Sequence, residues 1–388
     1  MISKILTAFN FFFKGSYKFN VPKKNDVLIF DSVGSEYIYE YLYDYDFSVL
    51  ETRGEVINIY VLIMSVLKIK LFLSNPIKSY LFSYIKCVSP KLVITFIDNS
   101  RIFYEISSYF PDIKTIFIQN GIRDEVFFHI LPTKKTFKVD HMLVINRAFG
   151  ELYKKKIAGR TEVIGYFKSN FYEINKKNNN NQYVLFISQY ENKVNSKIKN
   201  LYLKNRNPFE WCETLQNEIK LIQLIDLWCK QNSIKLVVAG REVEYIDEEY
   251  DYYKKYLKLS DWDFTNTSKK NGYDQVDKAE VVVTLDSTLG YESLARGNKT
   301  LFFVTREYEE QILYPFGWPI KMDSDGFFWT THSDKKEFDR IMNQIFNLGK
   351  PHWKKLLGKL NADLFIEDSG NMKFKLLLKN ILKEKQTC

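Results

Sequence analysis

Residues 280–304, EVVVTLDSTLGYESLARGNKTLFFV, form a complete strand–turn–helix–strand pattern. One apolar, β-branched run ends at Leu285, and a second one begins at Lys299. Between them, Ser287 and Thr288 are typical of a helix start. Apolar runs that are continuous rather than alternating are typical of parallel strands covered by helices on both faces. The stretch therefore predicts a βαβ unit within a parallel sheet.

The same pattern repeats on both sides of the polar, Asn-rich stretch EINKKNNNNQ at residues 173–182. Such a stretch cannot bury itself and predicts a linker. The apolar runs predict strands at 26–32, 92–99, 114–121, 141–146 and 162–167 before it, and at 183–189, 235–240, 280–285 and 299–304 after it. We therefore expect an α/β protein with two Rossmann-like domains and a cleft between them. The expected parts are an N-terminal acceptor domain at 1–174, a linker at 175–182, a nucleotide-donor domain at 183–365 and a C-terminal helix at 366–388.

Composition fits this organisation and narrows the partners. A chain of 388 residues, 45% of them hydrophobic, suits two domains of roughly 150–200 residues. The net charge of +9 suits a phosphorylated ligand or an anionic membrane, and since no nucleic-acid-binding motif occurs, we expect no nucleic-acid partner. The four cysteines and four histidines show no metal-ligand or disulfide spacing, which predicts a cytoplasmic protein without a metal.

Two apolar segments and one basic segment bear on membrane contact. The N-terminal run at 2–15 and the run at 56–73 are both interrupted by polar residues, so neither reaches the roughly 20 apolar residues of a membrane span. The tail at 373–386, KFKLLLKNILKEKQ, places leucines between lysines at helical spacing. It either docks peripherally on an anionic membrane at its inner face or returns to cover the first domain.

Polar residues follow the predicted strands of the second half, where an open α/β sheet binds its ligands. The helix start at Ser287 and Thr288 offers N–H groups and hydroxyls to a phosphate, and Glu292, one turn later, can accept a ribose hydroxyl pair. The alternative is a plain capped helix with a solvent-facing glutamate. The predicted nucleotide-binding residues are Gly240, Arg241, Asp286, Ser287, Thr288, Gly290 and Glu292. The acidic residues at 242, 244, 247–249 and 251 predict a solvated helix face.

The first half carries the motifs FIDNS at 96–100 and IQNGIRDE at 118–125. Amide side chains, a glycine that allows close backbone approach and an arginine that can hold a carboxylate or phosphate favour substrate binding. The alternative is an Asn-Gly turn with solvated charges. The predicted substrate-binding residues are Asn99, Gln119, Asn120, Gly121, Arg123, Ser188 and Gln189.

Three carboxylates are candidates for catalysis. Asp98 ends a strand and could take the proton of an acceptor hydroxyl, or it could cap the next helix. Asp124 and Glu125, beyond the QNG turn, compete for the same role, or supply a second carboxylate if a covalent intermediate forms.

These motifs together resemble a known family. TFIDNS, FIQNGIRDE, FISQY, VVAGR, the DST segment and YPFGWP followed by GFFW extend from Thr95 to Trp329. They resemble GT-B glycosyltransferases of bacterial surface-carbohydrate biosynthesis, of the lipopolysaccharide or capsule type, related to transferases of Kdo-type sugars from CMP donors. The resemblance implies a metal-independent transferase that needs no cofactor, with a nucleotide-sugar donor and a lipid-linked or oligosaccharide acceptor. A polyol-phosphate transferase, a nucleotide-sugar epimerase and a non-catalytic glycan-assembly partner are the alternatives. The aromatic loop YPFGWP either stacks on a ligand or packs structurally.

Overall fold

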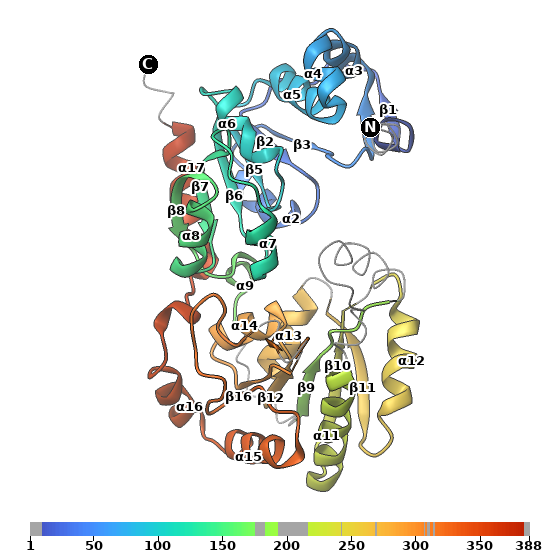
Figure 1. The fold of residues 1–388 in the computed structure, drawn as a ribbon, viewed down its shortest axis with the longest axis vertical. Helices are drawn as coiled ribbons and strands as arrows, with labels where there is room; N and C mark the ends of the chain where they lie inside the picture. Colours follow the sequence, from blue (N-terminus) through green and yellow to red (C-terminus); the bar gives the residue numbers. More distant parts are fainter. Residues whose placement is uncertain are drawn as a thin grey trace. The chain divides into compact units, whose positions relative to one another are not determined.

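A computed structural model describes residues 10–174, 183–192, 216–241, 243–267, 270–305, 307–308, 311–312 and 315–383. The predicted linker at 175–182 lies outside these residues. The chain forms two compact units (Figure 1). Unit 1 combines Met1–Phe171 with Asp368–Cys388, and unit 2 is Tyr172–Glu367. The chain passes from unit 1 to unit 2 after Phe171, three residues before the predicted end of the first domain at 174. It returns to unit 1 at Asp368, two residues after the predicted start of the C-terminal helix at 366.

Unit 1 is built on a six-stranded sheet in which every paired neighbour is parallel. Its spatial order is β3 (Phe47–Leu50), β2 (Val27–Phe30), β5 (Leu92–Thr95), β6 (Lys114–Ile118), β7 (Lys138–Val144) and β8 (Ala158–Val163). Four of these strands, β2, β5, β6 and β7, coincide with predicted runs, whereas the run predicted at 162–167 overlaps β8 only at residues 162–163. The edge strand β3 was not predicted, because its four residues, FSVL, are only half-buried and carry a short apolar signal.

The helices of unit 1 are mostly short. They are α2 (Glu36–Tyr39), η1 (Glu40–Leu42), α3 (Ile59–Val66), α4 (Ile69–Ser74), α5 (Pro76–Val88), η2 (Phe103–Glu105), α6 (Ile106–Tyr109), α7 (Glu125–Ile130), α8 (Arg147–Lys154), α9 (Phe167–Phe171), η5 (Ser369–Asn371) and α17 (Met372–Lys383). Helix α5 shows how local sequence sets its ends. Asn75 accepts a hydrogen bond from the Lys78 N–H at 3.0 Å, Pro76 occupies the first turn, and Ser89 ends the helix in a left-handed conformation.

A small layer of unit 1 lies beside the main sheet. Strand β1 (Ser16–Lys18) pairs in parallel with β4 (Val56–Asn58), and α3, α4 and α5 pack on one another (Figure 1). Phe11 and Phe12 both pack edge-on against Tyr80 of α5, at ring-centroid distances of 5.9 and 5.7 Å. The predicted apolar run at 56–73 therefore forms β4 and two short helices.

The C-terminal tail forms helix α17, whose apolar face is buried. Its apolar side chains Phe374, Leu377, Leu378 and Leu382 are buried within unit 1. The Phe374 ring meets Tyr41 edge-on at 5.3 Å. The apolar face of the helix thus stabilises unit 1, and the interpretation of the tail as a lipid-binding helix is wrong for residues 372–383. Residues 384–386 of the predicted segment lie outside the described residues.

Unit 2 holds a second six-stranded sheet, again with parallel neighbours throughout. Its order is β11 (Trp262–Asn266), β10 (Lys235–Gly240), β9 (Tyr183–Ile187), β12 (Val281–Thr284), β13 (Thr300–Phe303) and β16 (Trp329–Thr330). A two-stranded antiparallel ribbon joins β14 (Glu307–Tyr308) to β15 (Gln311–Ile312). The helices are α11 (Gln216–Asn232), α12 (Ile246–Tyr256), α13 (Lys270–Lys278), α14 (Thr288–Ala295), α15 (Lys335–Phe346), α16 (Lys350–Leu357) and η4 (Ala362–Leu364).

The start of the helix predicted at 211–231 falls on residues outside the described ones, and its described part is α11. Over the described part of the chain, every helix is too short or too polar to cross a lipid bilayer.

Candidate functional site

Asp98 lies just beyond β5 and is completely buried. Arg123, beyond the neighbouring strand β6, donates from Nε to Asp98 Oδ2 at 2.8 Å and from Nη2 to Oδ1. Tyr153 of α8 donates its hydroxyl to the same carboxylate, and Tyr104 of η2 donates to the Asp98 carbonyl. A charge this deep is tolerated because an opposite charge and several hydrogen bonds replace its hydration.

The pKa values in this cluster follow from the balance between burial and the interactions with Asp98. Burial by itself lowers the pKa of Arg123, but the Asp98 carboxylate and its hydrogen bonds outweigh burial and raise it. Burial, assisted by Asp98, raises the pKa of both Tyr104 and Tyr153 well above the ordinary value. The arginine therefore stays cationic and both tyrosines stay neutral donors.

This geometry changes the interpretation of Asp98 as a general base. A base must reach the proton that it takes. Both Asp98 oxygens face donors from within unit 1, and the side chain has no exposed surface, whereas the Arg123 side chain is 19% exposed. The arrangement fits a carboxylate that positions Arg123, which is the member of the pair that reaches the surface.

The two other candidate carboxylates lie at the start of α7. Asp124 caps this helix, because its Oδ1 accepts a hydrogen bond from the Phe127 N–H at 2.6 Å. Glu125 is exposed, and its Oε1 lies 3.9 Å from Nε2 of His129, one turn further on. Asp124 therefore has a structural role, and Glu125 is the one that solvent reaches freely.

The amides of the QNG turn mainly organise the turn itself. Gln119 is buried, donates from Nε2 to the Gly121 carbonyl at 2.9 Å and accepts from the Ile145 N–H at 3.1 Å. Asn120 accepts from Arg123 through its Oδ1. Asn99, by contrast, is exposed beyond β5. Gln119 thus ties together the ends of β6 and β7.

A second acidic strand end in unit 1 was missed by the sequence analysis. Asp31 follows β2, is buried and has a φ of 86°, a left-handed conformation that is costly for a residue with a Cβ. It accepts hydrogen bonds from the Val33 N–H at 2.9 Å, from the Thr52 hydroxyl and from Arg53 Nε at 3.3 Å. Asp31 could have been found, because it directly follows the apolar residues of the strand predicted at 26–32. Thr52 and Arg53 follow β3 and could not, because β3 was not predicted.

In unit 2, the turn from β12 to α14 has the predicted geometry of a helix start. The Ser287 Oγ accepts from the Leu289 N–H at 3.3 Å, and the Ser287 N–H donates to the Thr284 hydroxyl at 3.2 Å. Asp286 and Thr288 flank it and are half-buried. Gly290 is required for packing, because a Cβ there would lie 2.5 Å from Thr284 Cγ2. The glycine therefore lets α14 approach β12 closely.

Glu292 lies one turn into α14. It is buried rather than solvent-facing, and its Oε2 accepts a hydrogen bond from the Tyr273 hydroxyl of α13 at 3.1 Å. The alternative of a solvent-exposed glutamate is thus wrong. A buried carboxylate beside a helix start can accept hydrogen bonds from a polyol while the N–H groups hold an anion.

Ser188 and Arg241 follow the neighbouring strands β9 and β10 and share one partner. Glu249 of α12 is fully buried, accepts the Ser188 hydroxyl, and accepts the Arg241 N–H at 2.9 and 3.0 Å. Gln189, next along the chain, is also buried. The prediction of a solvated face is wrong for Glu249, because this side of α12 packs on β10. Residue 242, the first of the predicted acidic set, lies outside the described residues.

The guanidinium of Arg241 points elsewhere than its N–H. It pairs with Glu191 Oε1 at 3.2 Å and remains 47% exposed. The Tyr253 hydroxyl of α12 lies within hydrogen-bond distance of both Ser188 Oγ and Glu218 Oε1, at 2.7 and 2.8 Å. Burial and the Glu218 carboxylate raise the pKa of Tyr253 well above its ordinary value. The buried Glu249 therefore holds the backbone of the Gly240–Arg241 turn, while the Arg241 side chain extends towards the surface.

The aromatic loop after β15 is packed rather than open, as far as its described residues 315–319 show. The Phe316 ring stacks on Trp329 at 4.6 Å and on Tyr291 of α14 at 5.7 Å. The Tyr291 hydroxyl accepts the Gly317 N–H at 3.0 Å. For Phe316 and Trp329 the structural alternative holds. Residue 314 lies outside the described residues.

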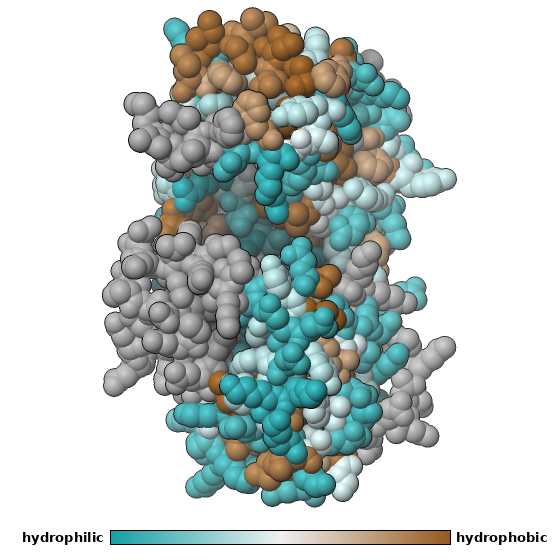
Figure 2. All heavy atoms as spheres, turned by 90° about the vertical axis from the view of Figure 1, so that its right-hand side faces the viewer, coloured by the Kyte–Doolittle hydropathy of each residue, from teal (hydrophilic) through white to brown (hydrophobic). Residues whose placement is uncertain are grey.

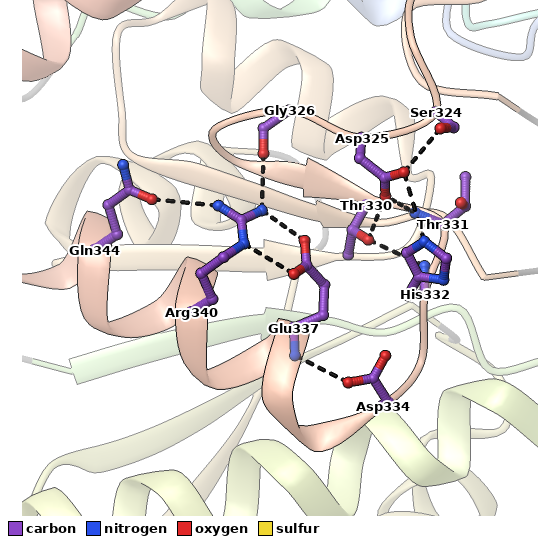
Figure 3. Close-up of polar contacts among 10 residues, drawn as sticks. All are labelled: Ser324, Asp325, Gly326, Thr330, Thr331, His332, Asp334, Glu337, Arg340 and Gln344. Atoms are coloured by element: carbon purple, nitrogen blue, oxygen red, sulfur yellow. Dashed lines mark hydrogen bonds and ion pairs between the residues drawn. The ribbon is translucent and has the colours of Figure 1, made fainter.

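Another polar cluster in unit 2 joins the β16 region to α15 (Figure 3). Asp325 accepts from the hydroxyls of Thr330 and Ser324, each at 2.7 Å. Burial by itself raises the pKa of Asp325, but these hydrogen bonds outweigh burial and lower it. Arg340 pairs with Glu337 and donates to the Gly326 carbonyl at 3.1 Å. The groups satisfy one another, so the cluster holds the loop against the helix.

Among the residues that the structure describes, no group of three or more His, Cys, Asp or Glu side chains could hold a metal ion.

Two Rossmann-like units, each with a parallel six-stranded sheet, define the chain as a GT-B protein. Residues 116–382 match the family described as "putative O-antigen biosynthesis protein". The chain belongs to this family, so its place is in surface-glycan biosynthesis.

Solved structures with similar folds agree with this class. The UDP-GlcNAc 2-epimerase from Neisseria meningitidis, bound to UDP-GlcNAc, has a TM-score of 0.53 at 11% identity, covering 91% of this chain and 99% of that one. The wall teichoic acid polymerase TagF has a TM-score of 0.52 at 11% identity, covering 93% and 90%. The S. aureus MnaA–UDP structure has a TM-score of 0.53 at 10% identity, covering 92% and 96%. At such identities the similarity concerns the fold. Among curated proteins, no sequence matches this chain.

Proposed function

We propose that the chain is a glycosyltransferase that moves a sugar from a nucleotide donor onto a growing surface glycan such as O-antigen or capsule. The observation that carries the proposal is the start of α14. There a hydroxyl-capped helix start lies one turn from the buried carboxylate of Glu292. The helix start offers positive charge and N–H groups to a phosphate, and the carboxylate can accept the ribose hydroxyls.

The rest of the donor site comes from two strand ends of unit 2. The outward guanidinium of Arg241, next to Gly240 after β10, can neutralise a phosphate. Asp286 and Thr288 flank the start of α14 after β12, and Gly290 lets α14 approach β12 closely. No step in this proposal uses a metal: the arginine, the hydroxyls and the helix start stabilise the leaving phosphate. The resemblance to Kdo-type transferases makes a CMP-linked acidic sugar the donor that we propose.

Unit 1 would then hold the acceptor, a lipid-linked or free oligosaccharide. Arg123 is positioned by Asp98 and can hold an anionic group of a substrate. Asn120 and Gly121 lie just before it in the sequence and are half-buried, and Asn99, beyond the neighbouring strand β5, is exposed. Ser188 and Gln189 are buried, which suits support of the donor site more than direct contact. For the proton of the acceptor hydroxyl, the exposed Glu125 is now the first residue to test.

The first experiment identifies the nucleotide. CMP, CDP and UDP are each added to the full chain, and the shift of the unfolding temperature is measured, since a ligand stabilises only the protein that binds it. We expect the largest shift with CMP. A shift with UDP or CDP alone would indicate an epimerase-like or polyol-phosphate donor instead.

The second experiment tests the site by calorimetry. Glu292→Ala should weaken binding of the stabilising nucleotide by roughly 1–3 kcal/mol, the cost of leaving a buried hydrogen-bonding group without its partner. The matched control is Glu337→Ala, which removes a glutamate from α15 of the same unit. Equal affinities in the two variants would contradict the assignment of Glu292. Turnover with a nucleotide sugar and an oligosaccharide acceptor then separates a transferase from a non-catalytic assembly partner.

A further inference from the structure

The exposed apolar side chains of unit 1 gather on α3, α4 and the loop between them. We call this surface the α3–α4 face, and it consists of Ile63, Met64, Val66, Leu67, Ile69 and Leu73. Figure 2 shows the same concentration as brown atoms at the end of unit 1 that carries α3 and α4. Soluble proteins rarely leave a contiguous apolar surface open to water, so such a surface indicates a partner.

Aromatic residues from the N-terminal segment extend this face. Phe13 and Phe19 are both strongly exposed and flank β1, which pairs with β4 just before α3. Beneath them, Phe12 packs on Tyr80 of α5 and on Phe72 of α4. The apolar surface is therefore supported by a packed layer and is not a set of loose ends.

The two chain segments that form the α3–α4 face and its aromatic extension are positively charged. Residues 10–25 and 56–91 contain nine lysines, four in the first segment and five in the second, and no aspartate or glutamate. Lys78 and Lys91 pair with Glu105 and Asp26 from outside these segments. Lys14, Lys18 and Lys70 are exposed. Burial and the nearby charge of Lys86 lower the pKa of Lys68, as expected where positive charges crowd together.

Together, the exposed apolar side chains and the lysines favour one kind of partner over another. A second copy of the chain docking through the same face would set lysines against lysines, which is unfavourable in a symmetric contact. An anionic lipid bilayer complements both features, since its acyl region accepts leucines and aromatic rings while its headgroups attract lysines. Lysine side chains can extend their charged ends to the headgroups while their stems stay in apolar surroundings.

The lengths of α3 and α4 determine how these helices can contact a membrane. Helix α3 has eight residues and α4 has six, far below the roughly 20 that a span requires. We therefore propose that unit 1 docks on anionic membranes through the α3–α4 face, with the helices lying in the headgroup region. The interaction belongs to unit 1 and does not depend on the identity of the donor, so it can be tested separately from the transferase activity.

The experiment measures co-flotation of the full chain with vesicles of phosphatidylcholine alone or with one-third phosphatidylglycerol. We expect binding to the anionic vesicles that weakens as salt is added. The double variant Leu67→Asn, Leu73→Asn should bind at least roughly tenfold more weakly, because it places amides where apolar side chains enter the lipid. The two leucines are 69% and 78% exposed, so the fold should be unaffected, which circular dichroism checks.

The matched control is Leu259→Asn, Leu376→Asn. Leu259 is 50% exposed and follows α12 in unit 2, and Leu376 is 60% exposed and lies on α17, so neither belongs to the α3–α4 face. The control should bind anionic vesicles like the unmodified chain, and Lys14→Gln with Lys70→Gln should weaken binding by roughly fivefold for each charge. Equal binding of all variants, or no binding by the unmodified chain, would overturn the proposal. Dimers that the Leu67, Leu73 variant abolishes, without vesicle binding, would assign the face to a second copy instead.

Discussion

Each unit has an arginine that follows a strand and a buried carboxylate that binds it, but the carboxylate binds a different part of the arginine in each unit. In unit 1, Asp98 binds the guanidinium of Arg123, which is only 19% exposed. In unit 2, Glu249 binds the backbone N–H of Arg241 and leaves its guanidinium 47% exposed. The same two kinds of residue therefore build a closed ion pair in one unit and an outward-facing cation in the other. This difference suggests that unit 2 is the one prepared to receive a highly charged ligand.

The largest expected effect comes from breaking the closed pair. Asp98→Asn leaves the Arg123 charge buried without its partner, which should lower the free energy of unfolding by roughly 3–5 kcal/mol. Urea denaturation measures this loss. The exposed Glu125→Gln serves as the control and should change stability by less than about 0.5 kcal/mol. A stable Asp98→Asn protein that has lost its turnover would instead restore Asp98 as the catalytic base.

A smaller effect is expected at the open cation. Arg241→Gln should lower the free energy of unfolding by less than Asp98→Asn does, because the Arg241 side chain is 47% exposed and the glutamine amide can still donate a hydrogen bond to the buried Glu191. Its nucleotide affinity should fall by about 1.5–3 kcal/mol, the value of a hydrogen bond to a charged group. Calorimetry and denaturation of the same variant separate the two quantities. A large loss of stability with unchanged affinity would mean that the two arginines do not differ in role.

The smallest effect concerns a third arginine–carboxylate pair, Arg340 with Glu337 on the surface of α15 (Figure 3). The hydrogen bond from Arg340 lowers the pKa of Glu337 below its ordinary value of 4.5. A lowered pKa means that the pair stabilises the fold at pH values above 4.5 and that this contribution is lost as the pH falls through the folded-state pKa.

The corresponding measurement compares Glu337→Gln with the unmodified chain. At pH 7 the variant should be less stable by roughly 0.5 kcal/mol, and the difference should vanish towards pH 3. A difference that does not depend on pH would show that the pair contributes through packing rather than charge.

The sequence predicted most of the central strands because buried parallel strands leave continuous apolar runs. It missed the edge strands β3, β11 and β16: β3 and β11 are only partly buried, and β16 is buried but only two residues long. It also located the strand ends that carry Asp98, Gln119, Arg241 and Ser287. The sequence could not show which way these side chains point. Glu249 was placed among solvated acids because helical spacing alone does not say which face of α12 meets the sheet.

The role of Asp98 was beyond sequence reasoning for the same reason. Its partners Arg123 and Tyr153 are 25 and 55 residues away along the chain. Only the parallel order of β5, β6 and β7 brings these segments together. In the sequence, a carboxylate that follows a strand therefore gives the same signal whether it is exposed or already paired with a cation.

Gly240 has a consequence for how this family can diverge. A Cβ at this position would lie 2.2 Å from the tip of the Phe264 ring on the neighbouring strand β11. The ring would have to move or shrink before any larger residue could be accepted. Among relatives, a side chain at 240 should therefore appear together with a smaller residue at 264, so that the two positions change as a pair across evolutionary time.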